Sequence, residues 1–347
     1  MTSEDFKNIL ESMGYSLIDC RDHWRTQALY RDGDNKTALK IYKDTGVWMD
    51  FVANKGCKPF NALVKETLKS NDPNLNKILS KIKNSDSPTI HEKKNTIEME
   101  KIYPNEHLDK LFPNYSFYKK KLISEETQKK FQVGLAGVGK MYRRMVFPIL
   151  NEHQQIIGFS GRKVDENNNF PKWKHIGRRN NWVYPAYNEL TGVKEQIETK
   201  KEVILVESIG DALALYEQNI KNVLVIFGLH VNSNIINFLN SRHINNIYIC
   251  TNNDSNSSEN RGLVAAIKNY LKLSCYFDLN IISIKFPPKP YNDFGDAHLA
   301  NCNFQDWQSQ PVDQDKQISY ICNFVKNNSS SFTKKEIKTS AVISNEQ

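Results

Sequence analysis

The sequence predicts an α/β protein whose largest part is a parallel sheet flanked by helices. Between residues 196 and 300, short apolar runs alternate with helical patterns, which is typical of parallel strands joined by crossover helices. Three of these runs, 203–206, 247–251 and 279–286, lead into acidic or amide residues. Because parallel strands bring their carboxyl ends to one edge of a sheet, we expect these side chains to meet there.

The residues after these runs predict a site for a divalent cation, Mg²⁺ or Mn²⁺. Clustered carboxylates repel one another unless a cation lies between them, and Mg²⁺ prefers oxygen ligands. The candidate ligands are Glu207, Asn252, Asp254, Asp293 and Asp296. Glu207, Asp211 and Asp254 are the candidate catalytic residues. The alternative is that these carboxylates only cap the helices that follow them.

The first 83 residues predict a small α+β module. Helices are expected at 4–13, at 59–68 and over part of 75–82. Strands are expected at 28–31 and 38–42, around an Asp-Gly turn, and at 47–51. The polar segment 84–100 is expected to be a linker.

Residues 101–195 predict a basic subdomain. A helix is expected after the N-cap residue Ser124, and a hairpin from the apolar runs 146–150 and 156–160. Residues 118–180 carry a net charge of +9, whereas the whole chain carries +8. A charge excess confined to one segment favours a polyanionic partner, and the alternative is a solvated lysine-rich face.

Residues 301–347 predict a C-terminal region with two amphipathic stretches, near Trp307 and at 318–325, before a polar tail that follows Asn327. No apolar run reaches the roughly 18–20 residues that span a bilayer, and the first residues lack the pattern of a secretory signal. We therefore expect a cytoplasmic protein without a membrane partner.

The cysteines argue against a structural zinc site. The six cysteines are scattered, with no Cys-x-x-Cys pair. Cys20 and His23 have ligand spacing and Cys57 lies further on, but this region lacks a fourth ligand. We expect the thiols to be reduced and zinc to be absent.

Two motifs together resemble the bacterial-type (DnaG-like) DNA primases. The pattern Glu207-x-x-Gly210-Asp211, Asn252-x-Asp254 and a late Asp293 resembles their Toprim domain. The segments 140–149 and 157–162, followed by Phe-Pro-Lys-Trp at 170–173, resemble their basic motif. The two motifs span roughly residues 101–300 in the order of the family. The absence of a helicase phosphate loop indicates a phage-encoded member acting with a helicase on a separate chain.

The resemblance implies template-directed synthesis of short RNA primers on single-stranded DNA, from ribonucleoside triphosphates, during DNA replication. It implies domains at 1–83, 101–195, 196–300 (Toprim, catalytic) and 301–347, the last as a possible contact for a replicative helicase. The basic residues that it assigns to template or nucleotide are Lys140, Arg143, Arg144, Arg162 and Lys172.

The chain departs from the family at two places. Asn252 stands where the family has aspartate, so it brings an oxygen ligand but no charge, and the usual glycine is displaced to Gly262. Residues 1–83 resemble the family's zinc ribbon without its full ligand set. Arg25, Arg31 and exposed aromatic residues such as Trp48 are candidate contacts for single-stranded DNA. For Trp48 itself, we favour a place in the core of this module over an exposed one.

Two other functions stay open at this point. A Toprim nuclease would use the same acidic edge to cut nucleic acid instead of joining nucleotides. A non-catalytic primase-like protein would bind single-stranded DNA without metal-dependent chemistry, and Asn252 is the residue that suggests it.

Overall fold

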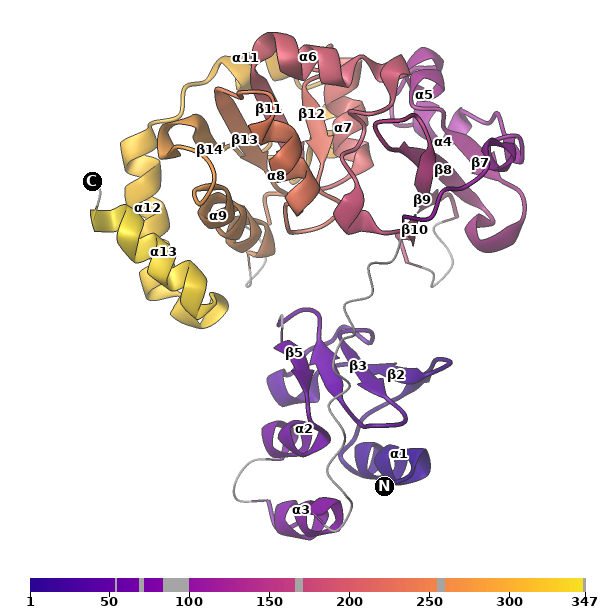
Figure 1. Cartoon of the computed structure of the whole chain (residues 1–347), viewed down its shortest axis with the longest axis vertical. Coiled ribbons are helices and arrows are strands. Elements are labelled where there is room, and N and C mark those ends of the chain that lie inside the picture. The colour runs from indigo at the N-terminus through magenta and orange to yellow at the C-terminus, as the bar shows by residue number, and fades with distance from the viewer. Residues whose placement is uncertain (54, 69–71, 84–99, 166–170, 255–259, 346–347) are drawn as a thin grey trace. The chain divides into compact units, whose positions relative to one another are not determined.

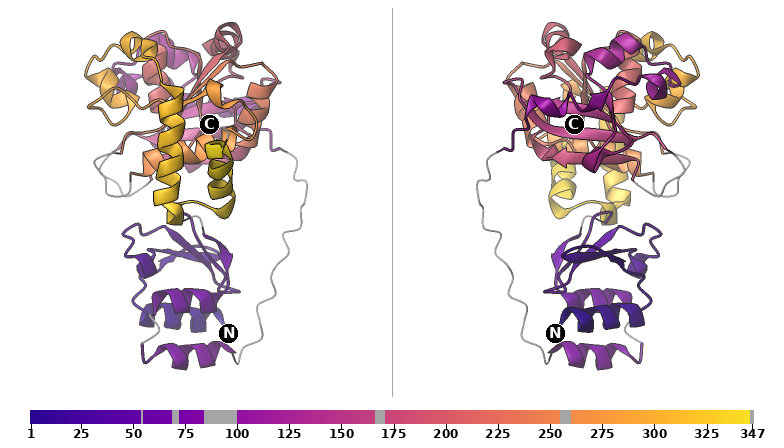
Figure 2. Two further views of the ribbon diagram at one scale, coloured as in Figure 1. Left: turned by 90° about the vertical axis from the view of Figure 1, so that its left-hand side faces the viewer. Right: turned by 90° about the vertical axis from the view of Figure 1, so that its right-hand side faces the viewer.

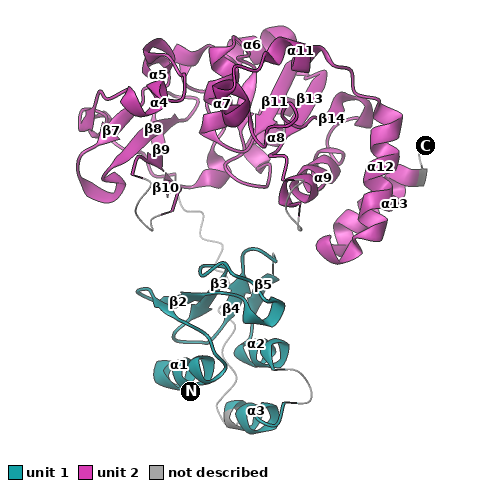
Figure 3. Ribbon diagram, turned by 180° about the vertical axis from the view of Figure 1, so that it is seen from behind, with its two compact units in different colours: residues 1–97 teal, residues 98–347 magenta. Residues whose placement is uncertain are grey.

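The computed structural model describes residues 1–53, 55–68, 72–83, 100–165, 171–254 and 260–345. The chain forms two compact units, residues 1–97 and 98–347 (Figure 3). The predicted linker 84–100 lies outside the described residues, except for its last residue. The predicted divisions within the second unit stay predictions.

The first unit is a five-stranded antiparallel sheet packed against helices (Figure 1). Its strands, in both chain and sheet order, are β1 Ile18–Asp19, β2 His23–Thr26, β3 Leu39–Tyr42, β4 Trp48–Asp50 and β5 Lys55–Lys58. Its helices, α1 Ser3–Ser12, α2 Phe60–Thr67 and α3 Leu75–Lys83, confirm the three predicted helices. Every second residue of β2, β3 and β4 points into a core that includes Trp24, Ile41 and Trp48.

The predicted strand at 28–31 is wrong. Residues Leu29–Arg31 form a 3₁₀ turn, and β2 is the strand that pairs with β3. The amide of Gly33 donates to the carbonyl of Ala28, which closes the turn. The turn brings the side chains of Tyr30 and Arg31 to Asp50, and these tertiary bonds override the local preference for an extended strand.

The second unit begins with an antiparallel sheet, here called sheet B, in the order β10-β9-β8-β7-β6. Its strands are β6 Leu111–Phe112, β7 Gly134–Ala136, β8 Arg144–Leu150, β9 Ile156–Lys163 and β10 Trp173–Gly177. Helices α4 Ser116–Lys119 and α5 Glu125–Lys130 lie before β7, and the Ser124 hydroxyl caps α5 by accepting from the amide of Thr127. The hairpin β8–β9 confirms the predicted one.

The parallel sheet of the second unit, here called sheet C, has the order β12-β11-β13-β14 and confirms the predicted fold class. Its strands are β11 Glu202–Val206, β12 Val223–Val225, β13 Asn246–Cys250 and β14 Ile282–Ile284. The helices between and beside them are α6 Val193–Lys200, α7 Ile209–Glu217, α8 Ser233–Asn240, α9 Arg261–Leu273 and α10 Phe294–Leu299. Helix α7 lies on one face of sheet C, and α8 and α9 lie on the other (Figure 1).

The C-terminal residues form three helices, α11 Phe304–Ser309, α12 Gln314–Asn327 and α13 Lys334–Asn345. The expected polar tail is therefore wrong for 334–345. Helices α12 and α13 pack together, and α13 also contacts α9 (Figure 2). Phe332 and Ile343 are buried in the main core and anchor this end of the chain. Among the residues that the structure describes, no helix combines the length and apolar character needed to cross a membrane.

Candidate active site

Glu207 lies at the carboxyl end of β11, where the predicted acidic edge forms. Its side chain is half-buried, and its Oε1 accepts a hydrogen bond from the amide of Asn252 over 3.0 Å. Burial raises the pKa of Glu207 to about 7. The hydrogen bond from Asn252 lowers this pKa, and repulsion from Asp211, Asp254 and Asp293 raises it further. Three carboxylates from three separate segments therefore act on Glu207, as the sequence pattern predicts.

Asp211 lies behind this edge, in the first turn of α7. Its Oδ2 accepts from the hydroxyl and the amide of Ser208, at 2.7 and 3.2 Å, in a capping box. Its Oδ1 accepts from the amide of Phe294 over 3.2 Å. Burial and the neighbouring Asp293 raise the pKa of Asp211 to about 6. Because both oxygens already serve backbone amides, the helix-capping interpretation holds for this residue.

Asp293 and Asp296 come from α10, which begins after β14. Asp293 caps this helix, since its Oδ1 accepts from the amide of Asp296 over 2.7 Å. Asp296 is exposed; burial and Asp293 raise its pKa, while Lys121 and Lys172 oppose the change. The outer end of the acidic edge, at Asp296, thus lies near the side chains of Lys121 and Lys172.

Asp254 and Asn252 lie after β13. The Oδ2 of Asp254 accepts from the amide of Gly262 over 3.2 Å, and its Oδ1 lies 3.2 Å from the amide nitrogen of Asn292, once that amide is oriented to satisfy both groups. A Cβ at position 262 would lie 1.8 Å from the carbonyl oxygen of Asn252. The displaced glycine is therefore required, because it lets α9 begin directly against the loop that carries the site.

The acidic edge suits a hard cation held partly by water and substrate. Its donors are all oxygens, and burial followed by repulsion among the carboxylates raises the pKa values of Glu207 and Asp211, so a cation bound there would favour their charged forms. Within the described ranges, no three His, Cys, Asp or Glu side chains converge closely enough to enclose a metal ion. Mg²⁺ is commonly bound by one or two carboxylates, with water and substrate phosphates completing its shell. The residues present fit that mode and not a closed protein cage.

Arg162 and Lys172 face the acidic edge from sheet B. Ser160 and Arg162 pair with His175 and Trp173 of β10, so all four lie on one face of the sheet. The Arg162 guanidinium lies over the rings of Phe117 and Trp173, at 5.8 and 5.9 Å. Arg162 and Lys172 line a hollow of about 90 Å³ together with Asp211, Asp293 and Asp296. The structure thus brings two of the five predicted basic residues to the predicted acidic ones.

A larger cleft of about 320 Å³ adjoins this hollow, and several of its residues were not predicted. Glu207, Asn252, Asp293 and Lys172 line it, as expected of the site. The lining residues that were not predicted as site residues include Ser160, Trp173, His175, Arg179 and Phe227. Strand alternation from Arg162 would have placed Ser160 on this face, but the pairing that adds His175 is not visible in the sequence.

The other three basic residues lie elsewhere. Lys140 lines a mostly apolar cavity beside Tyr103 and Phe159, and Phe159 belongs to the opposite face of sheet B from Ser160. Arg143 is 62% exposed, and its Nη1 lies 3.5 Å from Asp165 Oδ2. Neither residue is joined to the acidic edge, and their roles stay predictions.

Arg144 is a correction, because it is buried and serves the fold. Its guanidinium donates to the carbonyls of Gly161, Pro171 and Lys172, at 3.0, 2.9 and 3.4 Å. A planar fork of donors suits such a set of backbone acceptors. The guanidinium therefore holds β9 to the start of β10 and is not presented to a nucleic acid.

Replacing Arg144 by methionine is expected to destabilise the second unit by about 2–4 kcal/mol, because three buried carbonyls lose their donor. Arg143→Met, one residue away and exposed, is the matched control and should change the free energy of unfolding by less than about 0.5 kcal/mol. Urea unfolding of the full chain measures both. Equal stability of the two variants would contradict the structural role of Arg144.

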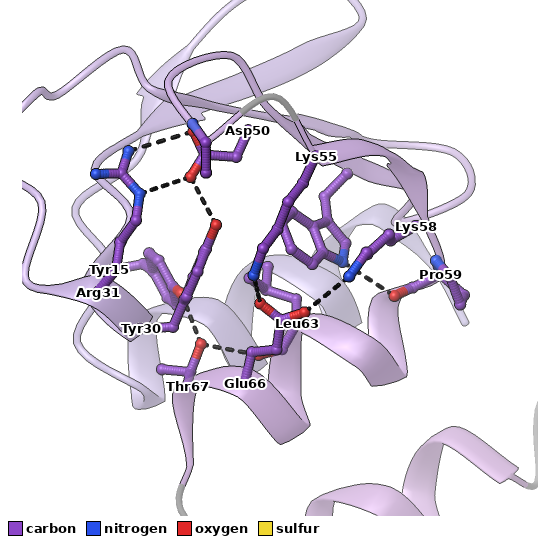
Figure 4. Close-up of polar contacts among 12 residues, drawn as sticks. Tyr15, Tyr30, Arg31, Asp50, Lys55, Lys58, Pro59, Leu63, Glu66 and Thr67 are labelled. Carbon is purple, nitrogen blue, oxygen red and sulfur yellow. Dashed lines mark hydrogen bonds and ion pairs between the residues drawn. The ribbon is translucent and has the colours of Figure 1, made fainter. Parts of the chain in front are cut away.

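The first unit has a polar network where the sequence suggested a degenerate zinc module. All six cysteines of the chain are free thiols, and in the described part of the chain Cys20, His23 and Cys57 belong to no cluster that could hold a metal ion. Asp50 is fully buried, and its carboxylate accepts from Tyr30 and Arg31 (Figure 4). In its described residues, this unit thus has ion pairs and hydrogen bonds but no cluster that could hold a metal ion.

The predicted contacts for single-stranded DNA in this unit divide into two groups. Arg31 pairs with Asp50, and Trp48 is fully buried, with its Nε1 donating to the carbonyl of Pro59 over 3.0 Å. The favoured interpretation of Trp48 as a core residue is therefore confirmed, and its ring is not exposed to DNA. Arg25 lies on the outward face of β2, where its guanidinium stacks over Phe51 at 4.7 Å, and Phe51 is 54% exposed. Arg25 and Phe51 thus form an outward basic and aromatic pair, and its contact with single-stranded DNA stays a prediction.

The segment that carries the acidic edge is similar to a known protein family, and parts of the chain are similar to known proteins. A protein family described as Toprim-like matches residues 204–294. The DNA primase of Lactococcus lactis is 38% identical over 88 residues, which cover 24% of this chain and 14% of the relative. The DNA primase of Aquifex aeolicus is 34% identical over 115 residues, which cover 32% of this chain and 22% of the relative. The matched regions thus span less than a quarter of these two relatives.

A solved structure of the Aquifex aeolicus primase, comprising its zinc-binding and RNA polymerase domains, is similar over 98% of this chain and 90% of its own. The TM-score is 0.51 and the sequence identity 16%. This likeness concerns the fold alone.

Proposed function

We propose that this chain, which carries a Toprim-like domain and is related to the DnaG-like primases, is a DNA-directed RNA polymerase that makes short primers on single-stranded DNA. The observation that carries the proposal is the acidic edge of sheet C facing Arg162 and Lys172 of sheet B within one unit. Joining nucleotides on a template needs carboxylates for the cation and basic groups for the phosphates. The geometry offers both across one cleft.

In the proposed reaction, the 3′-hydroxyl of one ribonucleotide attacks the α-phosphorus of the next. The new phosphodiester bond forms as the bond to pyrophosphate breaks. A bound Mg²⁺ or Mn²⁺ would neutralise the triphosphate and polarise the reacting oxygens. One or two of the carboxylates of Glu207, Asp254 and Asp293 would hold the cation, with water and triphosphate oxygens completing its shell, while Asp211 positions Ser208 and α10 behind them. Lys172 and Arg162 would hold phosphates of nucleotide or template.

Asn252 does not weigh against catalysis in this arrangement. Its amide donates to Glu207 and thereby orients the carboxylate, a role that the backbone of any residue could perform. Its side chain would bring only a neutral oxygen to a cation. We therefore place the charge of the site on Glu207, Asp254 and Asp293.

The test is primer synthesis on mixed-sequence single-stranded DNA, with labelled ribonucleotides and Mg²⁺ or Mn²⁺. Wild type should give short RNA products, and Lys172→Ala should reduce their yield roughly tenfold, because one phosphate contact is lost. Lys174→Ala, which removes a lysine from the opposite face of β10, is the matched control and should change the yield little. DNA cleavage without RNA products would favour the nuclease instead. DNA binding without either reaction would favour the non-catalytic protein.

A replicative helicase on a separate chain, acting through residues 301–347, stays part of the proposal. Adding the helicase is therefore the next step if the chain alone binds DNA and is inactive. A cytoplasmic location and a phage origin also stay predictions, and primer synthesis tests neither of them.

A further inference from the structure

The wall of the larger cleft contains two polar side chains that the proposed reaction does not yet use. Ser160 of β9 and His175 of β10 are cross-strand partners, so their side chains lie next to each other on the face toward the acidic edge. Ser160 is fully buried and His175 half-buried, and both line the cleft with Glu207 and Asp293. The pair therefore forms a polar floor opposite the carboxylates.

The polar atoms of this floor have no hydrogen-bond partner within the described part of the chain. Ser160 Oγ and His175 Nδ1 are both buried atoms without a donor or acceptor in reach. Folded proteins seldom leave buried polar atoms unpaired, because each one costs free energy. Two such atoms side by side at the floor of the cleft, Ser160 Oγ and His175 Nδ1, point to a ligand that supplies the missing hydrogen bonds.

The His175 ring is held in place as a neutral group. It packs edge-on against Trp182 and Phe227, with ring centroids 5.7 and 5.6 Å away. Burial and the nearby Arg179 and Arg144 lower the pKa of His175 to about 4. A neutral imidazole has one donor and one acceptor nitrogen, so it suits a neutral hydroxyl or base edge better than a phosphate.

The other cleft residues indicate the class of ligand. Trp173 and Phe227 offer aromatic surface, Lys172 and Arg179 offer positive charge, and the carboxylates of Glu207 and Asp293 suit a cation. A nucleoside triphosphate combines the three matching features, namely a flat base, a polyanion and a bound divalent ion. A bare polyphosphate would leave the aromatic and polar floor unused.

We propose that Ser160 Oγ and His175 Nδ1 bind the nucleoside part of the incoming ribonucleoside triphosphate and so determine how tightly it is held. The phosphates then lie between Lys172, Arg179 and the acidic edge. This inference rests on the proposed function, because it places that reaction's substrate in the larger cleft.

The test is calorimetric binding of ATP and of inorganic tripolyphosphate to the full chain, with Mg²⁺ and without DNA. Ser160→Ala and His175→Phe are each expected to weaken ATP binding by roughly 3- to 10-fold, the effect of one lost hydrogen bond. Tripolyphosphate binding should stay unchanged, since it does not reach the floor. Ser233→Ala, which removes an exposed hydroxyl from α8, is the matched control and should leave both ligands unaffected.

The melting temperature without nucleotide separates this role from a structural one. Ser160→Ala removes an unpaired buried hydroxyl, so the variant should melt at the same temperature as wild type or higher. The proposal is overturned if wild type does not bind ATP, if the variants bind ATP as wild type does, or if they lose tripolyphosphate equally. If wild type makes primers and the variants bind ATP as wild type does, Ser160 and His175 do not bind the nucleoside. The proposed function would then still stand.

Discussion

Replacing Glu207 by glutamine is expected to reduce primer synthesis by at least roughly a hundredfold and to stabilise the cation-free chain at neutral pH. The loss of activity is expected because the proposed site loses one of its carboxylate charges, whereas glutamine still accepts from the backbone amide of Asn252. The gain in stability follows because a half-buried carboxylate among three others no longer has to ionise. Activity and stability should therefore change in opposite directions.

The pH dependence of this effect has a definite sign. The pKa of Glu207 rises from 4.5 to about 7 on folding, so the folded chain holds its proton more tightly than the unfolded chain. Stability conferred by this proton is complete below about pH 4.5 and is lost as the pH rises to about 7. The difference between Glu207→Gln and wild type should grow over this window to at most about 3 kcal/mol and then stay constant. Mg²⁺ should reduce it.

Thermal unfolding between pH 4 and 8, with and without Mg²⁺, measures this difference. Glu195→Gln, at an exposed position of α6, is the matched control and should follow wild type at every pH. If Glu207→Gln retained full primer synthesis, Glu207 would lie outside the reaction and the proposed site would be wrong. If its stability matched wild type at pH 8, the burial and repulsion that raise the pKa of Glu207 would not destabilise the folded chain.

The acidic edge was predictable because it depends on local pattern. An apolar run followed by a carboxylate places that carboxylate at a strand end, and parallel strands share the edge at which they end. Glu207, Asp254 and Asp293 needed no knowledge of side-chain packing to be brought together. The helix-capping role of Asp211 could not be predicted in this way, because only the structure shows its oxygens accepting from Ser208 and Phe294.

The basic residues were harder to predict, because a guanidinium reaches whatever acceptors the fold supplies. Arg143 and Arg144 are neighbours in sequence, yet one is exposed and the other donates to three buried carbonyls. Those carbonyls come from residues 161, 171 and 172, which only the pairing of β9 with β10 brings near. Helix α13 was missed for a similar reason, since its burial depends on the contact with α9.

Replacing Asp50 by alanine is expected to destabilise the first unit by about 3–5 kcal/mol, which is a large part of the stability of a unit of this size. The carboxylate is fully buried and accepts from Tyr30 and Arg31, at 2.6 to 3.2 Å (Figure 4). It also accepts from the amides of Val52 and Ala53, at 2.8 and 2.9 Å. Removing it leaves four groups without their acceptor and Arg31 without its counter-ion. Hydrogen exchange should therefore accelerate across residues 1–68 and stay unchanged in the second unit.

Two further variants test whether the lost charge pairing is the cause. Asp44→Ala, an exposed position of the same unit, should leave exchange unchanged. Asp50→Leu combined with Arg31→Met should recover part of the loss, because no unpaired charge then remains. Without that recovery, the other hydrogen bonds of Asp50 would account for the whole effect.

Acid gives the same network an independent test. Burial alone would raise the pKa of Asp50, but the bonds from Arg31, Tyr30 and the two amides outweigh it and lower the pKa below its ordinary 3.8. The stability that Asp50 contributes is therefore present above about pH 3.8 and is lost as the pH falls through its lowered pKa. Wild type should lose stability in that acid range, and Asp50→Ala should lose much less there. Parallel acid curves for the two proteins would mean that the carboxylate is not the group that holds this unit together.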